Sequence, residues 1–139
     1  MAITKLSARQ EPKVAIFDFT YADLVSATYA AGIDLPLGAI VTRGELFVLT
    51  LFNSGTTDTF SIGSQVDGAA AVATTYAATS ADVTAVGRAA TVVPTGIKTT
   101  AGSTVGLVWT GAGAAPTAGV GKLVIEYIID GAAESTFDA

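Results

Sequence analysis

The chain has 139 residues, of which half are apolar and 14% are charged, and its formal net charge is −5. This length fits one domain, because two independent cores would each be marginal at half the size. There is no cysteine and no histidine, which excludes disulfides, thiolate or imidazole metal sites and a histidine-based catalytic triad. The acidic balance and the scattered placement of the seven basic residues argue against nucleic acid as a partner.

The low charge content indicates a surface that is buried in an assembly. Soluble domains carry roughly 25% charged residues, well above the value found here. A surface rich in alanine, threonine and glycine suits a subunit that contacts other subunits. The alternative is a monomer kept soluble by threonine and serine hydroxyls, and we favour assembly.

The sequence predicts neither a membrane span nor a signal peptide. The apolar stretch from Gly38 to Phe52 is interrupted by Arg43 and Glu45, so it falls short of the roughly 18 to 20 residues that a spanning helix needs. Residues 1–12 lack the apolar core of a signal peptide. We therefore expect no membrane partner and synthesis in a cytoplasm.

The N-terminal third is predicted to hold an arm and two extended segments. Residues 1–12 form the arm, which ends at Pro12, and the first strand follows from Lys13 to Thr20 with apolar groups on both faces. A second short extended run covers Ser26 to Ala31. Residues 33–38 then predict a strand end and a turn, because proline and glycine follow each other closely there.

The central part is predicted to begin with a β-hairpin. Glu45 to Phe52 and Thr57 to Ile62 both alternate like strands, and the four residues between them, Asn53 to Thr56, are typical of a tight turn. The alanine-rich residues 68–78 favour a helix by propensity, but the threonines beside them weaken it. We expect at most one or two helical turns here, with Ser80 as a possible N-cap.

Strands resume in the C-terminal third. Residues 88–93 end at Pro94, and Thr104 to Thr110 places Val105, Leu107 and Trp109 on one face. Val120 to Asp130 alternates most regularly, and a short tail, residues 132–139, follows. Seven or eight short strands with little helix predict an all-β fold: a jelly-roll-like β-sandwich of about eight antiparallel strands over residues 13–131.

The acidic residues offer weak candidates for chemistry. Asp18 and Asp23 could form a glycosidase-like pair, which requires carboxyl groups roughly 5 to 10 Å apart. We favour the alternative, in which Asp23 caps a turn and Asp18 faces solvent. Asp58 and Asp67 could share a calcium ion, but hard cations need more oxygen ligands than these supply.

The aromatic residues do not define a ligand site either. Trp109 could stack on a sugar, but its strand face of Val105 and Leu107 makes core packing the better interpretation. The sequence thus predicts no catalytic, metal-binding or cofactor-binding residue and no cofactor. A protein without a nucleophile and base is not expected to be an enzyme.

Several short motifs resemble those of small structural proteins of tailed phages, the capsid decoration or cement proteins. The resemblance covers residues 19–131, and the motifs are Tyr21-Ala22-Asp23-Leu24, Ile33-Asp34-Leu35-Pro36, Gly38-Ala39, Phe52-Asn53-Ser54-Gly55-Thr56, Ser61-Ile62-Gly63, and Ala115-Pro116-Thr117-Ala118-Gly119 with Lys122-Leu123-Val124-Ile125-Glu126-Tyr127. It implies a jelly-roll subunit, often a homotrimer, that is made in the host cytoplasm and binds the major capsid protein on the head surface. The resemblance implies no catalytic residue in this sequence.

The arm lies outside this resemblance. We expect it to reach a neighbouring subunit, with Ile3 and Leu6 as apolar anchors and Arg9 as a charge partner. The main alternative function is a receptor- or glycan-binding module of a tail fibre or spike, because the same fold serves that role.

Overall fold

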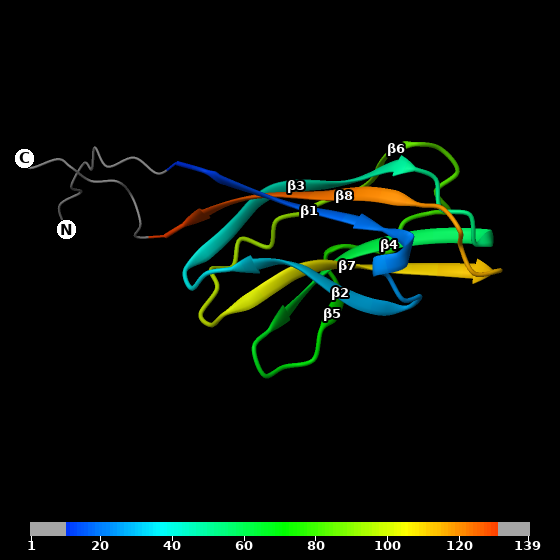
Figure 1. Cartoon of the computed structure of the whole chain (residues 1–139). Helices are drawn as coiled ribbons and strands as arrows, with labels where there is room; N and C mark the ends of the chain where they lie inside the picture. The colour runs from blue at the N-terminus through cyan, green and yellow to red at the C-terminus, as the bar shows by residue number, and fades with distance from the viewer. Residues whose placement is uncertain (1–10, 131–139) are drawn as a thin grey trace, which may run out of the picture.

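The structure, a computed structural model that describes residues 11–130, consists of two four-stranded antiparallel sheets packed face to face (Figure 1). In chain order its elements are β1 (Lys13–Thr20), the 3-10 helix η1 (Tyr21–Asp23), β2 (Thr28–Leu35), β3 (Ala39–Thr50), β4 (Gly55–Val66), β5 (Val72–Ala77), β6 (Gly87–Thr91), β7 (Ser103–Gly113) and β8 (Val120–Ile129).

The strand order is β1-β8-β3-β6 in the first sheet and β2-β7-β4-β5 in the second. Six of the seven connections between consecutive strands therefore cross from one sheet to the other, and only β4 and β5 are both consecutive and paired. This is the jelly-roll arrangement. The predicted all-β jelly-roll sandwich is confirmed, and within residues 11–130 the one helical element is a single short turn.

The core lies between the two sheets and is built by the alternating inward side chains. Phe52 contacts Phe60 edge to face with ring centroids 5.3 Å apart, and Trp109 lies 5.6 Å from Phe52. Trp109 is 3% exposed, which confirms that it packs in the core. The largest side chains that are fully buried are Phe19, Leu46, Phe60, Ile62, Leu107, Leu123 and Ile125.

The predicted β-hairpin between residues 45–52 and 57–62 is wrong. The strands themselves form, but β3 belongs to the first sheet and β4 to the second. Phe52 is buried between the sheets, so the chain crosses the sandwich here. Asn53 does not close a tight turn: its Oδ1 accepts hydrogen bonds from the backbone N–H groups of Thr117 (2.8 Å) and Ala118 (3.0 Å) in another connection.

The alanine-rich middle of the chain is extended. Residues 72–77 form strand β5, and no helical turn follows Ser80. The backbone N–H of Ser80 donates to the Phe60 carbonyl (2.7 Å), and its Oγ accepts from the Phe60 N–H (3.1 Å). The groups that would have capped a helix thus bind this segment to β4.

The two described ends of the chain lie at the same end of the sandwich (Figure 1). Lys13 at the start of β1 pairs with Tyr127 near the end of β8. Residues 1–10 and 131–139 lie outside the described part, and with them most of the predicted arm, the tail, and the expected contacts Ile3, Leu6 and Arg9. No helix within residues 11–130 is long and apolar enough to cross a membrane.

Candidate docking surface

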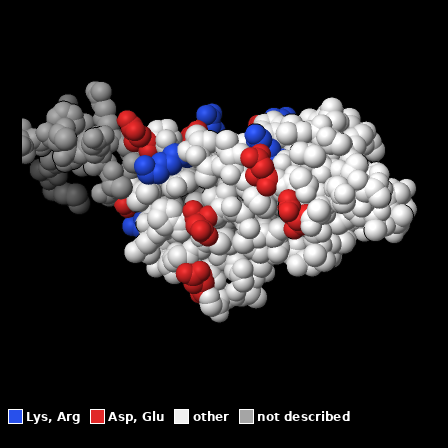
Figure 2. All heavy atoms as spheres, in the orientation of Figure 1, with Lys and Arg blue, Asp and Glu red and all other residues white. Residues whose placement is uncertain are grey.

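The two sheets differ in the charge that they carry. Every Lys and Arg among residues 11–130 lies in the first sheet or in the connection beside it: Lys13, Arg43, Arg88, Lys98 and Lys122. The strands of the second sheet contain Asp34 and Asp58 and no basic residue. On the face shown in Figure 2, charged side chains gather toward the end where β1 begins and leave the other end uncharged.

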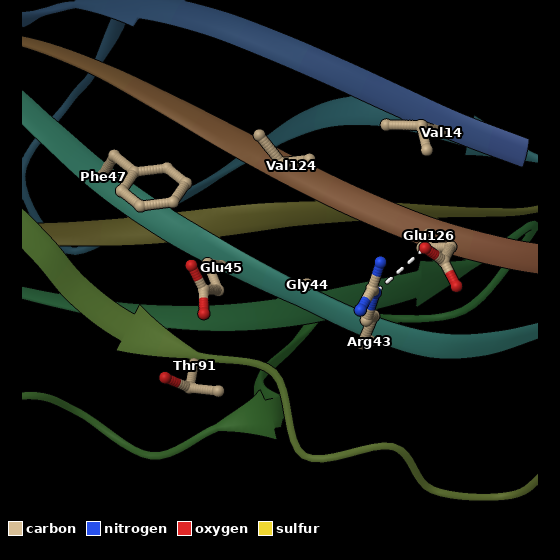
Figure 3. A pocket seen from close by; sticks show the side chains of 8 residues that line it. All are labelled: Val14, Arg43, Gly44, Glu45, Phe47, Thr91, Val124 and Glu126. Atoms are coloured by element: carbon tan, nitrogen blue, oxygen red, sulfur yellow. Dashed lines mark hydrogen bonds and ion pairs between the residues drawn. The ribbon is translucent and has the colours of Figure 1, made fainter.

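An open cleft of about 340 Å³ lies on the outer face of the first sheet (Figure 3). Three apolar side chains from neighbouring strands line it: Val14 from β1, Val124 from β8 and Phe47 from β3. The remaining lining residues are Arg43, Gly44, Glu45, Thr91 and Glu126. The cleft thus combines an apolar floor with charged groups beside it, a composition that protein-binding surfaces have.

A β-bulge in β3 determines how the charged side of the cleft is built. The pairing with β8 shifts between Val41 and Arg43, so two consecutive residues oppose one residue of the partner strand. As a result both Thr42 and Arg43 reach Glu126: Thr42 Oγ1 donates to Oε1 (3.1 Å) and Arg43 Nε donates to Oε2 (2.9 Å). The Glu126 side chain is thereby held in one orientation.

Arg43 remains available to a partner. Its side chain is 78% exposed, whereas that of Glu126 is only 19% exposed. The Nε–H binds Glu126, and the guanidinium carries further donors in a planar fork that suits a carboxylate or a carbonyl group.

Two further ion pairs cross the same face. Arg88 lies 3.2 Å from Glu45, and Lys122 lies 3.4 Å from Asp18. All four side chains are at least a third exposed, so these pairs add little to folding stability. Their groups can exchange partners on docking at small cost.

The two acids considered as a glycosidase-like pair, Asp18 and Asp23, have structural roles. Asp23 Oδ2 accepts hydrogen bonds from the backbone N–H (2.8 Å) and the Oγ1 (3.1 Å) of Thr20, which is the role of a turn cap. Asp18 is 73% exposed and pairs with Lys122. The structure therefore agrees with the structural interpretation of both residues.

Asp58 is buried and serves the core. Its Oδ1 accepts the indole N–H of Trp109 (2.9 Å), and its Oδ2 accepts the backbone N–H of Ser54 (3.3 Å). Its own backbone N–H donates to Asp82 Oδ1 (2.7 Å). Within residues 11–130 no three acidic side chains converge where a metal ion could be held.

Sequence reasoning missed the cleft. Its residues come from four strands, β1, β8, β3 and β6, so they are far apart in the sequence and form no local motif. In the structure the buried positions of β3 lose their period of two between Val41 and Gly44, where the bulge occurs, but Gly44 has no side chain that would show this shift in the sequence.

No protein-family model and no curated protein sequence matches the chain. Two solved structures are similar in fold. A chain of the acidic stable capsid structure of Helicobacter pylori bacteriophage KHP30 superposes with a TM-score of 0.63 at 16% identity, over 85% of this chain and 87% of that chain. A chain of the cyanophage Pam1 capsid asymmetric unit superposes with a TM-score of 0.61 at 19% identity, over 93% of this chain and 91% of that chain. At these identities the likeness is one of fold: the jelly roll described above also occurs in chains of two phage capsid structures.

Proposed function

We propose that this chain is a non-enzymatic structural protein of a phage virion, and that it acts as a capsid decoration (cement) protein that bridges major capsid proteins on the head. The observation that carries the proposal is the fold, which is shared over most of both chains with chains from two phage capsids. The sequence motifs noted above support the same function independently of the fold.

The outer face of the first sheet supplies a physical means of bridging. It offers an apolar floor and charged groups whose ion pairs are exposed to solvent. These charged groups can therefore form ion pairs with a partner instead. A decoration protein binds in many copies, so modest contacts at each site add up through multivalency. We propose that the subunits act as homotrimers, which fit threefold positions of a head.

The aromatic residues favour this function over a glycan-binding module. Glycan sites usually present exposed aromatic rings, whereas among the aromatic residues of the described part only Tyr21 is exposed, to 36%. Trp109 is directed into the core and bonded to Asp58. A receptor-binding module of a tail fibre or spike is therefore the second candidate.

The test uses heads of the encoding phage that were assembled without this chain. Purified full-length protein is added, and binding is followed by co-sedimentation, electron microscopy and the temperature at which heads release DNA. The proposal expects saturable binding at regular positions on the head and a higher release temperature. Antibody labelling of native virions only on the tail would favour the second candidate, and no virion binding would refute both.

Native mass spectrometry at micromolar concentration tests the oligomeric state separately. A trimer is expected, and a monomer at all accessible concentrations would refute the trimer proposal without refuting attachment to the head.

A further inference from the structure

One sheet edge of the sandwich is open and regular. Each sheet has two edge strands. Of these, β6 has five residues, β5 pairs with β4 at only two positions, and β2 is distorted by a bulge between Ala31 and Ile33. By contrast, all eight residues of β1 pair with β8 without a shift in register. No backbone–backbone hydrogen bond in the described part joins the other side of β1 to a further segment.

The side chains along this edge favour a partner. Val14 is 59% exposed and Ile16 is 53% exposed, both on the outer face of the sheet, and the exposed Asp18 follows them. Natural proteins usually protect such an edge with proline, bulges or a covering segment, because its free N–H and C=O groups bind any extended chain. Residues 13–20 contain no proline and no bulge, and their two charged residues, Lys13 and Asp18, leave Val14 and Ile16 exposed between them.

The chain itself contains a segment that complements this edge. Residues 1–10 include Lys5 and Arg9 and no acid, whereas all 12 Asp and Glu residues of the sequence come later. Asp18 is the acidic residue of β1 and its side chain is 73% exposed, so a lysine or arginine of the segment can pair with it. Fully extended, ten residues span about 33 Å, enough to pair with the whole of an eight-residue strand of about 26 Å.

The segment is poorly placed to pair with β1 of its own chain. Only Glu11 and Pro12 separate residue 10 from the start of β1. A two-residue hairpin needs positive φ at the turn, and proline is fixed at a φ of about −65°. A wider turn would consume the residues that should pair. The same segment from a second copy meets no such constraint.

We propose that the N-terminal segment, residues 1–10, of one copy adds as a further strand to the free edge of β1 in a second copy. Main-chain hydrogen bonds supply the attachment. Side chains alternate between the two faces of a strand, so Ile3 and Leu6 point to opposite faces of the added strand and one of them covers Val14 and Ile16. The contact is heterologous, so repetition around an axis closes a ring of subunits. The inference concerns self-association and holds whichever part of a virion the protein contacts.

The absence of cysteine makes a cross-linking test free of background. Two full-length proteins, Ile3→Cys and Leu6→Cys, represent the two faces of the added strand. Each is mixed under mild oxidation with one of three edge variants, Val14→Cys, Ile16→Cys or Asp18→Cys, which carries a size tag. The matched control is Val72→Cys on β5, an edge residue of nearly the same exposure, 55%.

At least one edge variant is expected to give about tenfold more mixed disulfide than Val72→Cys. Equal yields from the edge and control variants would overturn the proposal. So would a disulfide that forms only within a chain carrying both cysteines.

Hydrogen exchange provides a second readout that needs no engineered residue. In the full chain the free-edge amides of β1 are expected to exchange about tenfold more slowly than in a chain lacking residues 1–10, because strand addition protects them. The amides of β4 are the internal control, and unchanged exchange in β1 would overturn the proposal. Both tests are performed without heads, so their failure is distinct from failure of the decoration function.

Discussion

At the scale of single residues, the contact between Trp109 and Asp58 shows how the core tolerates a buried acid. Among residues 11–130 no Lys or Arg forms an ion pair with Asp58, and its side-chain oxygens are held by two N–H donors instead. Removing one donor leaves a buried oxygen without its partner, which costs the desolvation energy of that group.

Replacing Trp109 by Phe is therefore expected to lower the free energy of unfolding by about 3 kcal/mol, from the lost hydrogen bond and the lost volume together. Urea denaturation measures the change. In a double-mutant cycle with Asp58→Ala, the coupling energy should be about 1 kcal/mol or more. Simple additivity of the two substitutions would show that the hydrogen bond contributes nothing.

Gly106 is a second residue with a specific structural requirement. It lies on β7 where β2 passes so closely that a Cβ atom would overlap the Ala30 carbonyl oxygen and approach Tyr29 Cζ to 2.9 Å. The two strands would have to separate to accept a methyl group. Gly68 has no atom within 4 Å of such a position, although its φ is +79°.

We expect Gly106→Ala to destabilise the fold by about 3 kcal/mol through overpacking, and Gly68→Ala by about 1 kcal/mol through backbone strain alone. Thermal unfolding of both variants gives the comparison. An equal loss of stability in the two variants would mean that β2 and β7 can move apart at Gly106 without cost.

At the scale of elements, the sequence predicts strands better than it predicts their partners. The first strand, Lys13 to Thr20, has the same bounds in the structure, because its alternation is local. The hairpin failed because the choice between a tight turn and a crossing depends on Asn53 reaching Thr117, 64 residues away. No local pattern contains that information.

The candidate cleft is subject to the same limit. Arg43 and Glu126 are unremarkable in sequence, and they meet only because β3 is bulged opposite β8. Core residues such as Leu107 and Ile125 could be predicted from their period of two, since burial on one face is a property of the strand itself.

If the cleft docks on a head, reversing its exposed charge should weaken binding. We expect Arg43→Glu to lower the affinity for heads by about tenfold, because a like charge beside Glu126 also opposes the partner group that the arginine attracted. The matched control is Lys98→Glu, another exposed cation in an ion pair, 3.0 Å from Asp130. Co-sedimentation with heads measures both variants, and equal effects would place the docking surface elsewhere.

At the scale of the whole molecule, two tyrosines govern the response of the sandwich to alkali. Burial raises the pKa of Tyr29 above its ordinary value of 10, against a hydrogen bond with Thr104 that lowers it, and burial likewise raises the pKa of Tyr76. A raised pKa means that the folded state holds its proton more tightly than the unfolded chain does. The tyrosines therefore make their full contribution to the free energy of unfolding below about pH 10, the pKa of tyrosine in the unfolded chain. This contribution is lost as the pH rises through the raised pKa of the folded state.

Urea denaturation between pH 8 and pH 12 should show this decline beginning near pH 10. Tyr76→Phe is expected to make the decline shallower, since one fewer buried phenol must ionise. Absorbance titration of the same variant should lose one late-titrating phenol. A stability that rises above pH 10 would contradict the assigned direction of the shifts.

The pairing of Lys13 with Tyr127 places both described ends of the chain at one pole of the sandwich. Domains fused to the two ends of the chain would therefore lie close together, next to the open edge of β1. The connection between β7 and β8 lies at the other pole, where Thr20 pairs with Val120. A peptide inserted after Ala115 would project away from both ends, and this connection is the better site for displaying a foreign sequence on the protein.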